Sequence, residues 1–171
     1  MLRVIFDTNI YGLLLKEKDA DELERKIKKD KEFVVYSYKP IRQEIRDIPK
    51  ITKLSKKTRI LLLNLYDRIT GNHFLEHSIK ITELARKYYD YYRNSGGIYG
   101  WDTSIRIDFM IVACASMSKL DIVYSADNKT LLSKQALKAY KHINIKENLK
   151  LPTFFTYEEL LLKFRNPNPS I

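Results

Sequence analysis

Leu2-Arg3-Val4-Ile5-Phe6, followed at once by Asp7, is the stretch that decides the fold. The run is almost continuously apolar, which is typical of a strand covered on both faces, as in parallel sheets. Residues 33–36 and 121–124 have the same character. Segments with helical spacing separate these runs, so the sequence predicts an α/β fold built on a mainly parallel sheet.

Helical spacing and capping signals place the remaining elements. We expect helices over residues 19–31, from Pro40 to a stop at Pro49, from 55 or 56 to about 71, from about 74 to 93, from 103 or 104 to about 119, over 129–140 and over 157–164, with short strands over 143–145 and 154–155. The prediction is a three-layer α/β/α sandwich with four to five strands. One domain would take up residues 1–165, and residues 166–171 would form a flexible tail.

The composition favours a polyanionic partner. Lys and Arg number 31 against 21 acidic residues, a formal net charge of +10. Neutralising phosphates releases condensed counterions, which favours nucleic acid, although a solubilised surface explains the same charge. The single cysteine, Cys114, cannot form an internal disulfide and is most simply a core residue. With no membrane-spanning stretch and no leader at the first strand, we expect a cytoplasmic protein.

Two aspartates come directly after predicted buried strands. Asp7 follows the first, and Asp127 follows the third in Ser125-Ala126-Asp127. Each alone is explained by a turn or a helix cap. Ligands of parallel α/β sheets bind at the carboxyl ends of the strands, however, so both residues are candidate site residues.

Asp108 lies in a helix, residues 105–115, that is apolar nearly all round and is therefore expected to be buried. A buried carboxylate loses its hydration and needs a cation or hydrogen-bond donors. The helix N-terminus or a salt bridge would also satisfy it. A metal ion is the third explanation.

Glu44 lies in the helix after the second strand. At about 100° per residue it falls about 70° from the centre of the stripe formed by Ile41, Ile45 and Ile48, while Asp47 falls about 130° away. We therefore expect Glu44 to point past the sheet edge and Asp47 to face water.

Four carboxylates at one edge would repel one another and raise each other's pKa unless a hard divalent cation binds between them. Ligation by oxygen alone favours Mg²⁺ or Mn²⁺ over zinc. Such an ion can activate water and stabilise the charge that develops on a phosphodiester. The sequence therefore predicts a catalytic metal site made of Asp7, Glu44, Asp108 and Asp127.

The sequence resembles the PIN-domain family, which includes the VapC-type toxins of toxin–antitoxin pairs. The matching segments are Val4-Ile5-Phe6-Asp7-Thr8-Asn9, Glu44 in its helix, Asp108-Phe109-Met110-Ile111-Val112-Ala113-Cys114-Ala115 and Ser125-Ala126-Asp127, in the family's order. The resemblance implies an α/β/α fold and cleavage of RNA with Mg²⁺ or Mn²⁺, leaving a 3′-hydroxyl and a 5′-phosphate. It also implies a homodimer, an antitoxin protein as partner, and Asn9 and Ser125 as residues that hydrogen-bond the site acids or a water on the metal.

Two other functions remain as alternatives. The first is a catalytically inactive PIN-like scaffold that only binds RNA or a protein. The segment His73-Phe74-Leu75-Glu76-His77 also spells the H-x-x-E-H of some zinc metallopeptidases, with two histidines on one helix face and Glu76 as base. A surface-exposed first helical turn explains the same letters, and no third zinc ligand is evident.

Two further patterns in the sequence are weaker indications of function. A haloacid-dehalogenase-type phosphatase also begins with an aspartate after the first strand, but it needs a second aspartate where this chain has Asn9. The tyrosine-rich residues 87–93 could stack nucleobases or pack inward, and their helical spacing favours packing.

Overall fold

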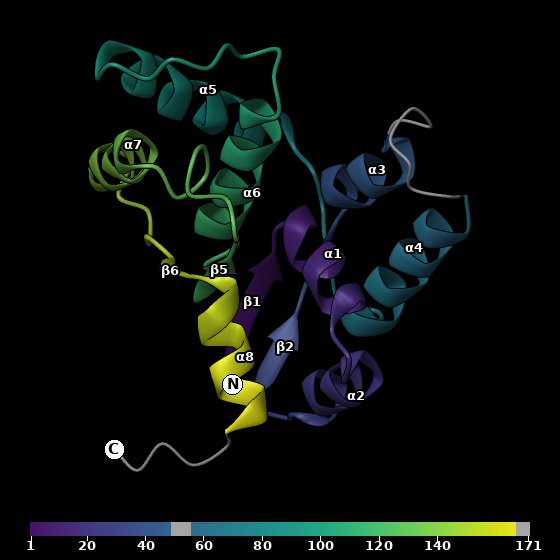
Figure 1. Cartoon of the computed structure of the whole chain (residues 1–171). Helices are drawn as coiled ribbons and strands as arrows, with labels where there is room; N and C mark the ends of the chain where they lie inside the picture. The colour runs from purple at the N-terminus through teal and green to yellow at the C-terminus, as the bar shows by residue number, and fades with distance from the viewer. Residues whose placement is uncertain (49–55, 167–171) are drawn as a thin grey trace.

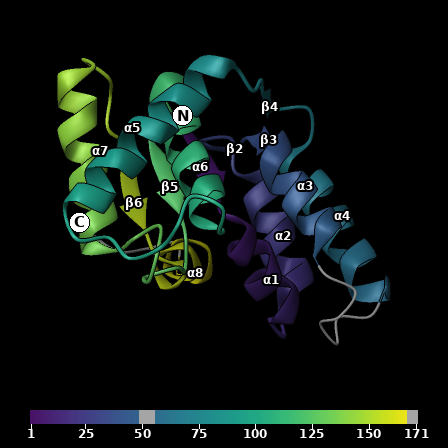
Figure 2. The same ribbon diagram turned by 90° about the horizontal axis from the view of Figure 1, so that it is seen from above.

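A four-stranded parallel sheet runs through the middle of the computed structural model, which describes residues 1–48 and 56–166. Its strands are, in spatial order, β2 (Phe33–Val35), β1 (Leu2–Phe6), β5 (Ile122–Tyr124) and β6 (Thr153–Phe155). Helices α1 to α4 lie to one side and α5 to α7 to the other (Figures 1 and 2). The structure thus confirms the predicted α/β/α sandwich with a parallel sheet.

The helices follow the strands in the alternation expected of a parallel sheet. They are α1 (Thr8–Lys16), α2 (Ala20–Lys29), α3 (Lys39–Asp47), α4 (Lys56–Thr70), α5 (Ile79–Asn94), α6 (Ile105–Met117), α7 (Lys134–Lys146) and α8 (Tyr157–Arg165). A second, two-stranded parallel sheet pairs β3 (Ser37–Tyr38) with β4 (Phe74–Leu75). Helix α1 and the β3–β4 pair are additions to the elements predicted from the sequence.

The predicted start at about residue 74 of the helix that runs to residue 93 is wrong. Phe74 and Leu75 extend and pair with β3, where the backbone N–H of Ser37 donates to the carbonyl oxygen of His73 over 2.6 Å. Helix α5 begins only after Ser78. His73 and His77 therefore do not share a helix face.

The predicted helix over 129–140 begins and ends too early, and the predicted strand over 143–145 is wrong. Helix α7 begins at Lys134, where the Ser133 side chain accepts a hydrogen bond from the backbone N–H of Ala136, and it continues to Lys146. The residues before it form a turn, because the Asp127 carboxylate accepts the backbone N–H groups of Lys129 and Thr130. Pro49 and residues 167–171 of the predicted tail lie outside the described residues.

Aromatic rings fill the core between α5, α6 and α7. Phe109 is fully buried, with ring centroids 5.5 Å from Tyr92 and 5.6 Å from Tyr140. Tyr88 is fully buried against the same ring, 6.4 Å away. Tyr88 and Tyr92 of α5 thus pack inward, whereas Tyr91 stacks on His142.

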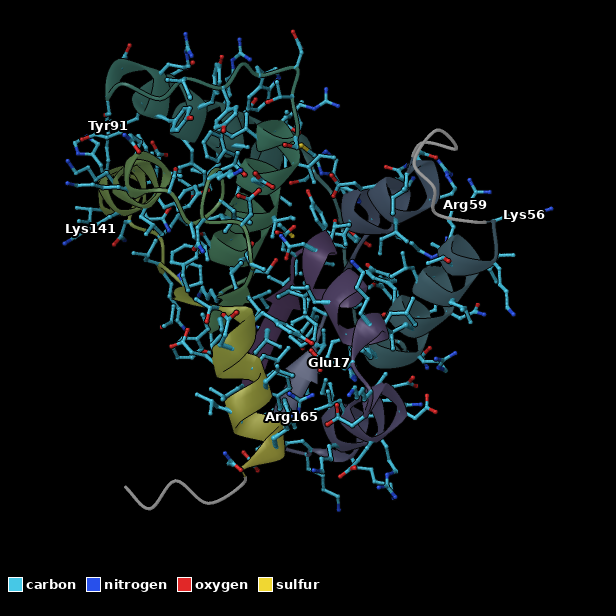
Figure 3. All side chains as sticks on the ribbon, viewed as in Figure 1. Glu17, Lys56, Arg59, Tyr91, Lys141 and Arg165 are labelled. Carbon is cyan, nitrogen blue, oxygen red and sulfur yellow. The ribbon has the colours of Figure 1, made fainter. Side chains whose placement is uncertain are left out.

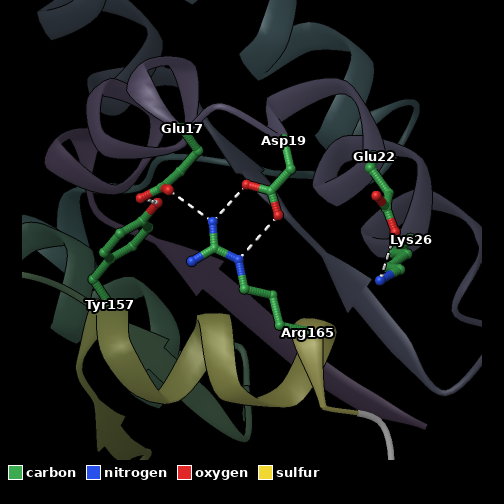
Figure 4. Close-up of polar contacts among 6 residues, drawn as sticks. All are labelled: Glu17, Asp19, Glu22, Lys26, Tyr157 and Arg165. Carbon is green, nitrogen blue, oxygen red and sulfur yellow. Dashed lines mark hydrogen bonds and ion pairs between the residues drawn. The ribbon is translucent and has the colours of Figure 1, made fainter.

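An ion-pair network fastens α8 to the connection between α1 and α2, where Arg165 and Glu17 approach each other (Figure 3). The Arg165 guanidinium donates to Glu17 over 2.7 Å and to both carboxylate oxygens of Asp19, while the Tyr157 hydroxyl donates to Glu17 over 3.0 Å (Figure 4). Hydrogen bonding to Arg165 lowers the pKa of both acids. The last helix is thereby held against the connection between the first two helices.

Within residues 1–48 and 56–166, no helix has both the length and the apolar character needed to cross a lipid bilayer.

Replacing Phe109 with alanine should lower the free energy of unfolding by about 3–5 kcal/mol, because it leaves a cavity among packed rings. Ile145→Ala is the matched control, since that side chain is 72% exposed and should change stability by less than about 0.5 kcal/mol. Urea denaturation measures both. Equal effects of the two substitutions would contradict the packing described.

Candidate active site

The carboxyl ends of β1 and β5 bring the first two candidate residues together. Phe6 and Tyr124 are register partners, so Asp7 and Ser125 emerge side by side from neighbouring strands. The Ser125 hydroxyl donates to Asp7 Oδ2 over 2.7 Å. Asp7 therefore lies at the carboxyl end of β1, as expected from its place directly after the first apolar run.

Asp7 is buried, with 4% of its surface exposed, and both carboxylate oxygens accept hydrogen bonds. Oδ1 accepts from the backbone N–H of Thr8 over 2.7 Å, which makes Asp7 the N-cap of α1. Oδ2 accepts from the Asn9 side-chain amide over 2.6 Å, as well as from Ser125. Asp7 is thus a helix cap and a member of the acidic site at once.

Asn9 and Ser125 also tie the loop after β1 to the loop after β5. The Asn9 side-chain oxygen accepts from the backbone N–H of Ala126 over 3.0 Å, and Ser125 Oγ accepts from the backbone N–H of Asp127 over 3.0 Å. The two side chains therefore fix the position of the Asp7 carboxylate relative to the segment that carries Asp127.

Asp108 and Asp127 meet at one hydroxyl. Thr130 Oγ1 lies 2.5 Å from Asp108 Oδ2 and 2.6 Å from Asp127 Oδ2. A hydroxyl has a single proton, so it can donate to only one of two carboxylates. The other short contact is favourable only when that carboxyl group carries a proton of its own and donates it to Thr130.

Glu44 reaches the site from α3. Its side chain is half-buried, and its Oε2 accepts a hydrogen bond from the Thr8 hydroxyl. Asp47 is exposed and pairs with its neighbour Arg46. As expected from the helical spacing, Glu44 faces the site and Asp47 faces water.

Burial and mutual repulsion raise the pKa of three of the four acids. Burial is the main cause for Asp7, whose pKa rises to about 6, and the charges of Glu44 and Asp127 add to it. Burial, followed by the charge of Asp7, raises the pKa of Asp108 well above its ordinary value. Burial also raises the pKa of Glu44. Asp7 and Asp108 each lie within electrostatic range of the other three acids.

Asp127 behaves in the opposite way, contrary to the expectation of a general rise. Burial alone would raise its pKa, but the donated hydrogen bonds from the Thr130 hydroxyl and from the backbone of Thr130 and Lys129 outweigh burial and lower it. The two acids that share Thr130 therefore have pKa values shifted in opposite directions. Neighbouring carboxyl groups with separated pKa values are a frequent feature of active sites.

The carboxyl groups are close but do not form a ready-made chelate. In the part of the chain that the structure describes, no group of three or more His, Cys, Asp or Glu side chains is arranged to hold a metal ion as it stands. Hydroxyl groups occupy the carboxylates instead: Thr130 on Asp108 and Asp127, and Thr8 on Glu44. The donors are oxygen atoms throughout, which suits Mg²⁺ or Mn²⁺, and an ion would have to replace hydroxyl contacts and a proton.

Thr8 and Thr130 are site residues that the sequence analysis missed. Each has a local signal, because Thr8 follows Asp7 directly and Thr130 stands three residues after Asp127, a spacing at which side chains commonly bond within a turn. The contacts of Thr130 with Asp108 and of Thr8 with Glu44 join distant segments and follow from the fold.

The histidine motif does not form a zinc site among the described residues. His77 Nδ1 lies 2.7 Å from the Tyr38 hydroxyl, and His77 Nε2 lies 3.2 Å from the Thr82 hydroxyl. His73 packs against the Tyr36 ring. Both nitrogens of His77 are thus engaged in structural contacts that join β3 to α5.

Comparison of the chain with models of protein families and with curated proteins gives no match.

The Asp108 carboxyl group predicts an unusual pH dependence of stability in metal-free buffer. Its pKa is higher in the folded than in the unfolded chain, so its contribution to stability is full below about pH 4 and is lost as the pH rises through the folded pKa. Asp108→Asn removes this loss and keeps a donor for Thr130. It should raise the free energy of unfolding at pH 7 by about 1–3 kcal/mol, with little change at pH 3.5.

Asp121→Asn is the matched control. The hydrogen bond from Lys150 lowers the pKa of Asp121, so its contribution is present at neutral pH and is lost as the pH falls through the lowered value. This variant should therefore be less stable than wild type at pH 7. Urea denaturation in EDTA across pH 3.5–7 measures both, and destabilisation by Asp108→Asn at pH 7 would contradict the description of the acidic pair.

Proposed function

We propose that this chain is a metal-dependent endoribonuclease of the PIN-domain type. The observation that carries the proposal is the convergence of Asp7, Glu44, Asp108 and Asp127 at the carboxyl end of a parallel sheet, with two of them buried. Buried like charges are costly for folding and persist where function needs them. The order of the segments along the chain, which resembles the PIN-domain family, supports the same proposal.

The oxygen donors fit Mg²⁺ or Mn²⁺, with Asp7 and Asp108 as direct ligands and Glu44 and Asp127 holding water or a second ion. Such an ion would lower the pKa of a water molecule and neutralise charge that develops on the phosphate. Asn9 and Ser125 keep Asp7 oriented through the hydrogen bonds that they donate to Oδ2.

The remaining chemistry concerns proton transfer. Asp127 is the one acid of the four whose pKa is lowered, and it is the candidate that accepts a proton from the attacking water, with Thr130 holding its carboxylate in place. In the hydrolysis, the water oxygen forms a bond to phosphorus and the bond from phosphorus to the 3′-oxygen breaks. The products are a 3′-hydroxyl and a 5′-phosphate.

RNA is the proposed substrate, and the net charge of +10 supports attraction to it. By the same resemblance, we propose a cytoplasmic homodimer, with an antitoxin protein as a further partner if the chain acts as a toxin.

The test compares wild type, Asp7→Asn and Asp108→Asn on an end-labelled single-stranded RNA with Mg²⁺, Mn²⁺ or EDTA. We expect cleavage only with metal and a loss of more than about 100-fold in each variant, because direct ligands should matter more than their supporting residues. RNA binding should persist or become tighter, since negative charge is removed.

Asp121→Asn is the control for this experiment, because Asp121 lies at the opposite end of β5 and pairs with Lys150. It should cleave like wild type. Absence of cleavage in every condition would indicate a module that only binds. Cleavage that survives EDTA and both active-site substitutions would show that the acids are structural.

A further inference from the structure

A cleft of about 1160 Å³ adjoins the acidic site. Its walls come from α3, from the β3–β4 pair and from the first half of α6. Figure 2 shows the β3–β4 pair beside α3, with α6 on its other side. The acidic site and the cleft are continuous, because Thr8 and Glu44 are among the residues that line the cleft.

The cleft combines an apolar wall with an exposed aromatic ring. Leu75, Ile107 and Met110 contribute partly buried apolar side chains. Phe74 lines the same cleft and leaves 70% of its surface in water, although its neighbour Leu75 packs against the core. A ring left exposed in this way presents a flat face to a ligand.

Two cations of the cleft have no acidic partner among the described residues. Arg42 is held by Asp67 in a bidentate pair, but Lys39 and Arg106 are exposed and form no ion pair within residues 1–48 and 56–166. Arg106 is two residues before Asp108 on α6. The lining of the cleft therefore includes two unpaired cationic side chains besides the exposed ring.

We propose that this cleft holds the nucleotides of a single-stranded RNA that adjoin the bond to be cut, which rests on the proposed nuclease function. A base stacks on Phe74, and the neighbouring phosphates contact Arg106 and Lys39. A single strand fits the arrangement because its bases are free to stack on an aromatic ring, whereas those of a duplex are stacked on one another.

The volume agrees with this occupant. Pockets for a single small molecule measure about 300–1,000 Å³, and the cleft lies just above that range, so its volume is compatible with a short stretch of chain. Because Glu44 lines the same cleft as Phe74 and Arg106, a strand held by these two residues lies next to the acids. The chemistry of the cleft thus gives the proposed nuclease a preference for unpaired RNA.

Binding of a fluorescein-labelled 12-nucleotide single-stranded RNA, followed by anisotropy in EDTA, tests this cleft separately from cleavage. Phe74→Ala should weaken binding by about 5- to 150-fold, the effect of losing one stacked base. Arg106→Ala should weaken binding and reduce the slope of log K against log salt concentration by about 0.7, as for one lost phosphate contact.

Matched controls come from α7, away from the cleft. Lys141→Ala removes an exposed charge, and Ile145→Ala removes an apolar side chain as exposed as Phe74. Figure 3 shows Lys141 on the opposite side of the molecule from Arg59 of α4, the helix beside α3. Both controls should bind single-stranded RNA like wild type, and thermal unfolding should show that all four variants fold.

A duplex of the same sequence separates stacking from general attraction, because Phe74→Ala should leave duplex binding unchanged. Wild-type affinity of Phe74→Ala and Arg106→Ala for single-stranded RNA would overturn the proposal. A loss of affinity in Phe74→Ala that is equal for single strand and duplex would overturn it too. The nuclease proposal itself is unaffected by that result, since it depends on cleavage and on Asp7 and Asp108.

Discussion

The carboxylate of Asp7 is the constraint on which the rest of the site depends. It stands where β1 ends and α1 begins, and it accepts hydrogen bonds from Thr8 and Asn9 at the start of α1 and from Ser125 after β5. One buried group therefore fixes the entry of a helix, the spacing of two loops and the position of an acid. Burial raises its pKa to about 6, so the fold bears a cost at neutral pH that hydrophobic packing elsewhere must offset. Such a cost is understandable where the group serves a reaction.

The second feature is the opposite direction of the pKa shifts of two acids that share one hydroxyl. Thr130 can donate to Asp108 or to Asp127, and the turn that precedes α7 decides the outcome by presenting two backbone N–H groups to Asp127. The pKa of Asp127 is lowered and that of Asp108 is raised, although both carboxyl groups contact the same hydroxyl. A divalent cation would compete with protons for Asp108, so metal affinity should rise with pH.

The sequence could predict the sheet and the four acids because both follow from local patterns. Buried parallel strands have apolar runs, and the residues after them lie at one edge whatever the details of the helices. The start of α5, the extent of α7 and the β3–β4 pair could not be predicted in the same way. Each depends on a contact between distant segments, such as that of Ser37 with His73, or on a turn such as the one held by Asp127. Contacts between distant segments also form the site around Thr130 and the cleft beside Glu44, so neither could be predicted from local patterns. For the same reason the histidine motif was predicted to be helical, although its residues 74 and 75 pair with β3.

The central claim is that these acids form a cation site, and diffraction from crystals of the whole chain grown with Mn²⁺ tests it most directly. Anomalous scattering locates the ion without relying on activity. The account predicts an anomalous peak coordinated by Asp7 and Asp108, with the Thr130 hydroxyl displaced from Asp108. The absence of any peak at this site under saturating Mn²⁺, with Thr130 still bridging Asp108 and Asp127, would contradict it.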